Sequence, residues 1–170
     1  MLNLYKKVLS TPKTVIPKEE LLSADIGDLG KKINTQVSRL FQGSLAIREV
    51  DIGSTGVEEH ELTSLSNCYY DCDRFGIHFV ASPRHADMLI VTGAVSRNSV
   101  EALRHAYEAT PTPKIIVALG NDAIDGGIFK GSYATYDGVK NIIPVDYEIP
   151  GDPPSPKVIL ASLLTILENR

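Results

Sequence analysis

Cysteine is scarce in this chain of 170 residues, which contains only two. Two cysteines without a repeated spacing do not make a disulfide framework, and they indicate an intracellular protein. No apolar run approaches the roughly 20 residues that a membrane-spanning helix needs. The first residues, Met1 to Lys7, turn polar too soon for a secretory signal. We therefore expect a cytoplasmic chain, alone or docked to a larger assembly.

Positive charge is not in excess either. The formal net charge is −4, which excludes the basic surface typical of nucleic-acid binding. The sequence has no Gly-x-Gly-x-x-Gly and no Gly-Lys-Ser/Thr pattern, so its glycines give little support for a nucleotide site. With 43% hydrophobic and 22% charged residues, the composition predicts a compact domain with a core of its own.

Strand-like and helix-like segments alternate from Leu45 to the end of the chain. Apolar runs predict strands at residues 45–51, 77–80, 88–92, 114–119 and 141–147. Helices are expected at 29–41 and 58–72, from a capping box at Asn98 and Glu101 to before Pro111, and after Ser155-Pro156. This alternation predicts an α/β domain in which a mostly parallel sheet of about four strands lies between helices.

The amino-terminal part has a different character. Residues 1–28 show scattered charge, two prolines and no sustained period, which predicts an extended arm; residues 29–170 then form the single domain. The helix at 29–41 has an apolar stripe, with Lys31, Lys32 and Arg39 largely away from it. Two interpretations stay open: the stripe packs on the chain's own sheet, or it rests on a membrane or a membrane subunit.

Four glycine-bearing loops follow expected strands, and none of them contains cysteine. They lie at residues 53–58, 92–95, 120–127 and 150–154. Loops at the carboxyl ends of parallel strands form a ligand crevice at one edge of an open α/β sheet. We therefore expect the functional edge of the molecule to be built from these loops.

Several stretches resemble one known family. The most telling are residues 73–77 (DRFGI) and 82–97 (SPRHADMLIVTGAVSR), followed by 125–129 (DGGIF) and 145–156 (VDYEIPGDPPSP). In this order and spacing they resemble the small, electron-transferring subunit of energy-converting [NiFe] hydrogenases and the B-type subunit of respiratory complex I. The resemblance implies a flavodoxin-like three-layer fold with one [4Fe–4S] cluster, held by four cysteines from the first, third and fourth loops.

The positions that match these four cysteines carry other residues in this chain. They are Ser54 and Val57 in the first loop, Asp122 in the third and Asp152 in the fourth. Clusters of this type depend on cysteine thiolates, and a valine side chain has no ligand atom. The resemblance therefore implies the scaffold without the cofactor, and we expect no cluster.

The two cysteines that are present, Cys68 and Cys72, come well after the first loop. Four residues apart on the expected helix, they would face the same side. The simpler interpretation is that both are small packing residues. As a metal pair they would need further ligands from His60, His78 or His85, and their spacing is not that of a zinc site.

The carboxylates of the loops allow several interpretations. Asp122 and Asp152 should approach each other, joined by Asp125, Glu58 and Glu59. Such a group could bind a hard cation through oxygen, could simply be hydrated, or could pair with a lysine or arginine of a partner. No acid–base pair with a defined substrate is present, so no catalytic residue is predicted.

Arg84 and His85 belong to the turn that, by the resemblance, lies against the large catalytic subunit near the cluster edge. We expect them to be interface residues. The leading hypothesis is a cluster-less structural subunit of a hydrogenase-like or complex-I-like assembly. Its partners would be a large subunit, with ferredoxin-like and membrane subunits, at the cytoplasmic face of the membrane. The alternatives are an electron-transfer subunit with a rebuilt metal site and a free-standing module for a small ligand.

Overall fold

A computed structural model describes residues 25–170 and contains a five-stranded sheet in the order β2-β1-β3-β4-β5, in which all neighbouring strands are parallel. The strands are β1 (Leu45–Asp51), β2 (Ile77–Phe79), β3 (Met88–Thr92), β4 (Ile115–Leu119) and β5 (Tyr147–Ile149). The helices are α3 (Asp25–Phe41), α4 (Val57–Ser64), α5 (Val100–Ala109), α6 (Asn121–Asp125) and α7 (Pro156–Glu168). This strand order is that of flavodoxin-like sheets. The predicted fold class is confirmed, with five strands instead of about four.

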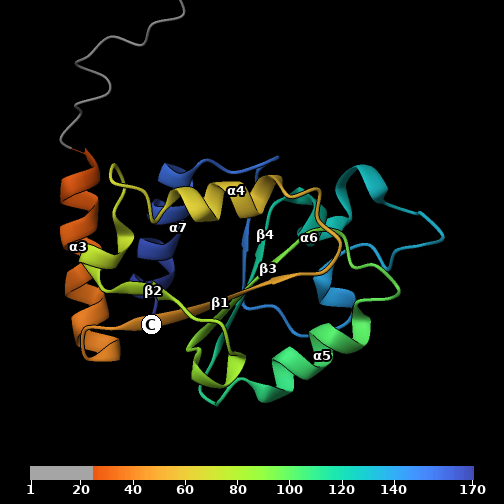
Figure 1. Ribbon diagram of the computed structural model, residues 1–170, viewed down its shortest axis with the longest axis horizontal. Coiled ribbons are helices and arrows are strands. Elements are labelled where there is room, and N and C mark those ends of the chain that lie inside the picture. Colours follow the sequence, from red (N-terminus) through yellow and green to blue (C-terminus); the bar gives the residue numbers. More distant parts are fainter. Residues whose placement is uncertain (1–24) are drawn as a thin grey trace, which may run out of the picture.

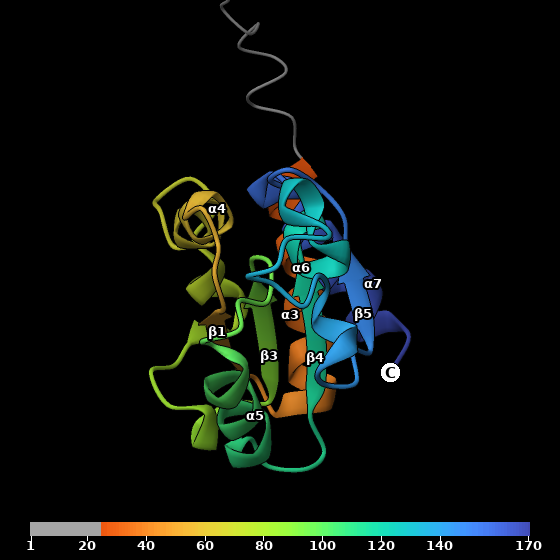
Figure 2. The same ribbon diagram turned by 90° about the vertical axis from the view of Figure 1, so that its right-hand side faces the viewer.

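Helices cover both faces of the sheet (Figure 1; Figure 2). Side chains of β3 and β4 alternate between two buried clusters, because successive residues of a strand point to opposite faces. Met88 and Ile90 join the cluster formed with α3, α4 and α7, while Leu89 and Val91 join the one formed with α5 and α6. Every residue of β3 and β4 is buried, as expected for parallel strands covered on both sides.

Helix α3 packs on the chain's own domain. Ile33 and Val37 of its apolar stripe are fully buried in the cluster with α7. At Gly30 an added Cβ would lie 2.1 Å from the ring of Phe75, so the absence of a side chain lets the ring approach the helix. The first of the two interpretations of this helix is thus confirmed, and its stripe is not free to rest on a membrane.

The predicted arm, residues 1–28, falls mainly outside the described residues, and its last part, 25–28, belongs to α3. Within residues 25–170, no helix has both the length and the apolar character needed to cross a bilayer.

Several predicted boundaries are wrong. Helix α4 ends at Ser64, not at residue 72, because Asn67 Oδ1 accepts the backbone N–H groups of Tyr69 and Tyr70 at 2.8 and 3.0 Å, a turn that competes with the helix. The capping box at Asn98 does not form: α5 follows Ser99, whose hydroxyl donates to the carbonyl of Ile52 at 2.7 Å.

The last strand also differs from its prediction at 141–147. Residues 139–141 form a short 3-10 helix, and β5 occupies Tyr147–Ile149. Ile143, within the predicted strand, and Val139, just before it, are buried from the loop on the α5 side of the sheet. An apolar run in a connecting segment can therefore be buried in the core without forming a strand of the sheet.

Candidate functional site

The carboxyl ends of the parallel strands meet at one edge of the molecule, where the loops after β1, β4 and β5 converge. The backbone N–H of Asn121 donates to the carbonyl of Gly151 at 2.8 Å, and the N–H of Gly151 donates to Asn121 Oδ1 at 3.1 Å. These bonds join the loop that carries Asp122 to the loop that carries Asp152. The parallel topology therefore brings Ser54, Val57, Asp122 and Asp152 to the same edge, as predicted.

The first loop is shaped by its own polar groups. Asp51 Oδ1 accepts the N–H groups of Gly53 and Ser54, both at 2.8 Å. The Ser54 hydroxyl accepts the N–H of Gly56 at 2.8 Å and donates to Glu59 Oε2 at 2.5 Å. Ser54 is thus engaged in holding the entry to α4, and Val57, 41% exposed, offers only an apolar surface.

Glu58 reaches from the first turn of α4 to the loop after β4. Its side chain is 1% exposed, its Oε2 has no hydrogen-bond partner, and an added Cβ on Gly120 would lie 2.7 Å from its Oε1. Burial raises the pKa of this carboxyl above its ordinary value. A backbone hydrogen bond acts in the opposite direction, and the charges of Asp122, Glu59 and Asp152 raise the pKa further.

Asp122 lies beside Glu58 and is 5% exposed. An added Cβ on Gly127 would lie 1.8 Å from its Oδ1, so only glycine fits against this carboxylate. Burial is the main cause that raises the pKa of Asp122, followed by the charge of Asp152, while a hydrogen bond from the backbone of Ile128 lowers it. Glu58, Asp122 and the exposed Asp152 form what we call the acidic cluster.

Asp125 belongs to a different environment. It is ion-paired with Lys130 at 2.8 Å and accepts the N–H of Gly127 at 3.1 Å. The hydrogen bond from Lys130 holds its pKa below the ordinary value. Asp125 therefore has a cation of its own, unlike the residues of the acidic cluster, although its charge still raises the pKa of Asp122.

The acidic cluster has no cation among residues 25–170. The ion pairs formed by these residues involve other carboxylates. In the same part of the chain, no group of three or more His, Cys, Asp or Glu side chains is arranged so that it could hold a metal ion.

The donor set at this edge does not fit a cluster held by thiolates. Ser54 is bonded to Glu59, Val57 has no donor atom, and the buried Glu58 and Asp122 add negative charge beside a position that would already hold anionic ligands. Cys72 is buried in the core with α3 and α7, and Cys68 is exposed outside α4. The expectation that these two cysteines share one helix face is therefore wrong, because α4 ends before both.

Arg84 and His85 lie at the other edge of the sheet. They form a short 3-10 helix, Pro83–His85, just before the amino end of β3. Both are exposed, and they border a groove of about 480 Å³ beside the last turn of α3 and Pro111–Pro113. The structure does not bring them near Asp122 and Asp152, so their expected closeness to the cluster edge is wrong. Their role at an interface stays a prediction.

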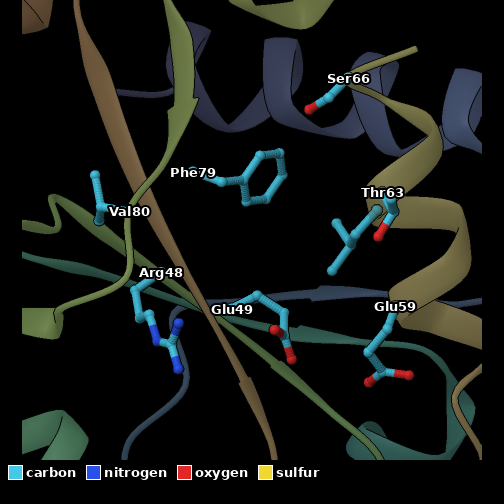
Figure 3. Close-up of a pocket in the computed structure, with 8 residues that line it drawn as sticks. Arg48, Glu49, Glu59, Thr63, Ser66, Phe79 and Val80 are labelled. Carbon is cyan, nitrogen blue, oxygen red and sulfur yellow. The ribbon is translucent and has the colours of Figure 1, made fainter.

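A pocket of about 300 Å³ lies between α4, β1 and the end of β2 (Figure 3). Glu49 and Glu59 line it from facing elements, with the ring of Phe79 nearby. Burial, followed by the charge of Glu59, raises the pKa of Glu49, and the Thr92 hydroxyl donates to Glu49 Oε1 at 3.4 Å. The sequence analysis missed Glu49, although its place in β1, in phase with Leu45 and Ile47, marks it as a charged residue on an inward face.

Comparison with known proteins agrees with this architecture. Residues 56–166 match the family described as NADH ubiquinone oxidoreductase, 20 Kd subunit. A probable membrane-bound hydrogenase subunit of Pyrococcus furiosus is 39% identical over 141 residues, which cover 83% of this chain and 84% of the relative. A component of the F420H2 dehydrogenase of Methanosarcina mazei is 37% identical over 128 residues, covering 75% of this chain and 68% of that protein.

A solved structure is similar in both sequence and fold. A chain of the membrane-bound sulfane sulfur reductase, an archaeal respiratory membrane complex, superposes with a TM-score of 0.64 at 32% identity. The match covers 80% of this chain and 75% of that one. Because the family match extends over more than half of the sequence and the relatives align along most of their length, the chain belongs to the 20 kDa subunit family of NADH:ubiquinone oxidoreductase, which the resemblance had indicated.

Proposed function

We propose that this chain is a subunit of a hydrogenase-like or complex-I-like respiratory assembly, in which it holds neighbouring subunits and carries no electrons through a cluster of its own. Membership of the 20 kDa subunit family supports the role of a subunit. Two relatives come, by their names, from a membrane-bound hydrogenase and a respiratory membrane complex. The chain would reach the cytoplasmic face of the membrane through its partners.

The chemistry of the carboxyl edge is the observation that carries the proposal. Ser54, Val57, Asp122 and Asp152 stand where the family resemblance implies cysteines, and the two cysteines of the chain lie elsewhere. Iron–sulfur clusters of this type need thiolate ligands. The scaffold supports docking to other subunits, whereas the donor atoms do not support electron transfer.

Metal analysis tests the missing cluster. Full-length protein purified without oxygen is expected to be colourless and to contain neither iron nor acid-labile sulfide. The matched control is a variant with Ser54→Cys, Val57→Cys, Asp122→Cys and Asp152→Cys, treated with iron and sulfide under the same conditions. Stoichiometric iron and sulfide in the wild-type protein would contradict the proposal.

Assembly is tested separately. The chain, tagged in its native host and extracted in mild detergent, is expected to co-purify from membranes with a large hydrogenase-like or complex-I-like subunit identified by mass spectrometry. A wild-type chain that runs only as a lone monomer under these conditions is incompatible with the role of a structural subunit.

A further inference from the structure

The acidic cluster holds more buried negative charge than is usual for an isolated subunit. Glu58 and Asp122 are 1% and 5% exposed, their charges interact, and Glu58 Oε2 lacks a hydrogen-bond partner. An ionised carboxylate taken out of water is costly unless a cation or hydrogen-bond donors compensate for its lost hydration. Within residues 25–170, no ion pair involves Glu58, Asp122 or Asp152, although the backbone of Ile128 donates a hydrogen bond to Asp122.

The surface beside the cluster has the character of a protein contact. Asp152 and Gly127 border a groove of about 650 Å³ that is also lined by Ile128. Ile128 is 78% exposed and the neighbouring Phe129 37% exposed. Apolar groups exposed next to a groove are typical of interfaces, where arginine and aromatic residues are enriched.

The other carboxylates of this groove already have cations. Asp125 pairs with Lys130 at 2.8 Å, and Glu148 lies 3.8 Å from Lys140. Of the carboxylates that line this groove, Asp152 is therefore the one without an ion pair among residues 25–170, and its charge interacts with those of Asp122 and Glu58. A complementary surface needs one basic group at that point and apolar contacts around it.

We propose that a lysine or arginine side chain of the partner subunit pairs with Asp152 at the acidic cluster and compensates the charges of Asp122 and Glu58 beside it. This inference rests on the proposed function, because it presumes a partner at the carboxyl edge. A basic side chain fits better than a free metal ion, since the cluster, within the described part of the chain, lacks a metal-holding arrangement and the apolar rim at Ile128 would pack against the protein that carries the cation. In the assembly, a charge-assisted hydrogen bond between this cation and Asp152 would lower the cost of the negative charges buried beside it.

Binding of charge-neutral variants tests the inference. Detergent-solubilised complex from a host strain lacking the chain is immobilised, and binding of the purified full-length chain is measured over a series of NaCl concentrations. Glu58→Gln and Asp122→Asn are expected to weaken binding by about tenfold or more, because a partner cation would remain buried with less compensation. The matched control is Glu101→Gln on α5, an exposed carboxylate on the other face, which is expected to bind like the wild type.

The possible outcomes distinguish a failure of the proposed function from a failure of the inference about the acidic cluster. If the wild-type chain does not bind the complex, the proposed function fails and this inference falls with it. If the wild type binds and both variants bind equally well, the inference alone is overturned. A Mg²⁺ titration of the isolated wild type that shows one bound equivalent, lost in Asp122→Asn, would assign the acidic cluster to a metal and would also overturn it. Urea unfolding of each variant shows that a loss of binding does not come from a loss of folding.

Discussion

Glu58 shows how a single residue links the stability of this chain to pH. Burial raises the pKa of its carboxyl, so the folded chain holds the proton more tightly than the unfolded chain does. The contribution of Glu58 to the free energy of unfolding is therefore most favourable below the ordinary carboxyl pKa, and it declines as pH rises through the raised value. The isolated subunit is less stable at neutral pH than it would be without this ionisation.

Glu58→Gln is expected to remove the decline in the free energy of unfolding that accompanies the ionisation of Glu58 at rising pH. At pH 8 the free energy of unfolding of the variant should exceed that of the wild type by about 1 kcal/mol, since an uncompensated buried charge is gone. At pH 4, the difference in free energy of unfolding between the variant and the wild type should be smaller. Urea unfolding at the two pH values measures both effects, with Glu101→Gln as the exposed control. A variant less stable than the wild type at pH 8 would contradict the uncompensated charge.

The two cysteines should differ sharply in reactivity. Cys72 is fully buried and burial raises the pKa of its thiol, whereas Cys68 is exposed. Because the thiolate is the reactive form, a colorimetric disulfide reagent should modify Cys68 rapidly in the native protein and Cys72 only after unfolding. Cys68→Ser should abolish the rapid phase. A rapid phase that survives in this variant would show that Cys72 is accessible.

At the scale of elements, the docking of α3 depends on one glycine. A methyl group at Gly30 would meet the ring of Phe75 at 2.1 Å, whereas nothing lies within 4 Å of the same position on Gly27. Gly30→Ala is therefore expected to lower the free energy of unfolding by about 1–3 kcal/mol through overpacking.

Gly27→Ala is the matched control on the same helix. It should be neutral or raise the free energy of unfolding by up to about 1 kcal/mol, because alanine has the higher helix propensity. Thermal or urea unfolding of both variants measures the difference. Equal effects of the two substitutions would show that α3 does not pack closely on Phe75.

For the whole molecule, the two edges of the sheet can be tested separately as contact surfaces. Arg84 is exposed at the edge of the strand amino ends, away from the acidic cluster. Arg84→Glu is expected to change the free energy of unfolding by no more than about 0.5 kcal/mol and to reduce co-purification with the large subunit from the native host. Arg104→Glu on α5 serves as the charge-reversal control. Unchanged co-purification of Arg84→Glu would favour the carboxyl edge over the amino edge as the contact surface.

The α/β class could be predicted from the order of apolar runs and amphipathic segments along the chain. Apolar runs such as Met88–Thr92, rich in β-branched residues, predict strands covered on both faces, and their alternation with amphipathic helices favours parallel pairing. The glycine loops also had to meet at one edge, because parallel strands all end on the same side. For these reasons the convergence of Asp122 and Asp152 was predictable without coordinates.

The environment of individual side chains depends on contacts between segments that are distant in sequence. Burial of Glu58 depends on the loop that begins at Gly120, more than 60 residues away in sequence, and no local pattern encodes that contact. The same holds for the burial of Cys72 against α3 and α7. Periodicity in the sequence indicates which face of a helix or strand is apolar. The pKa and the partner of a charged group depend instead on which distant segments the fold packs against it.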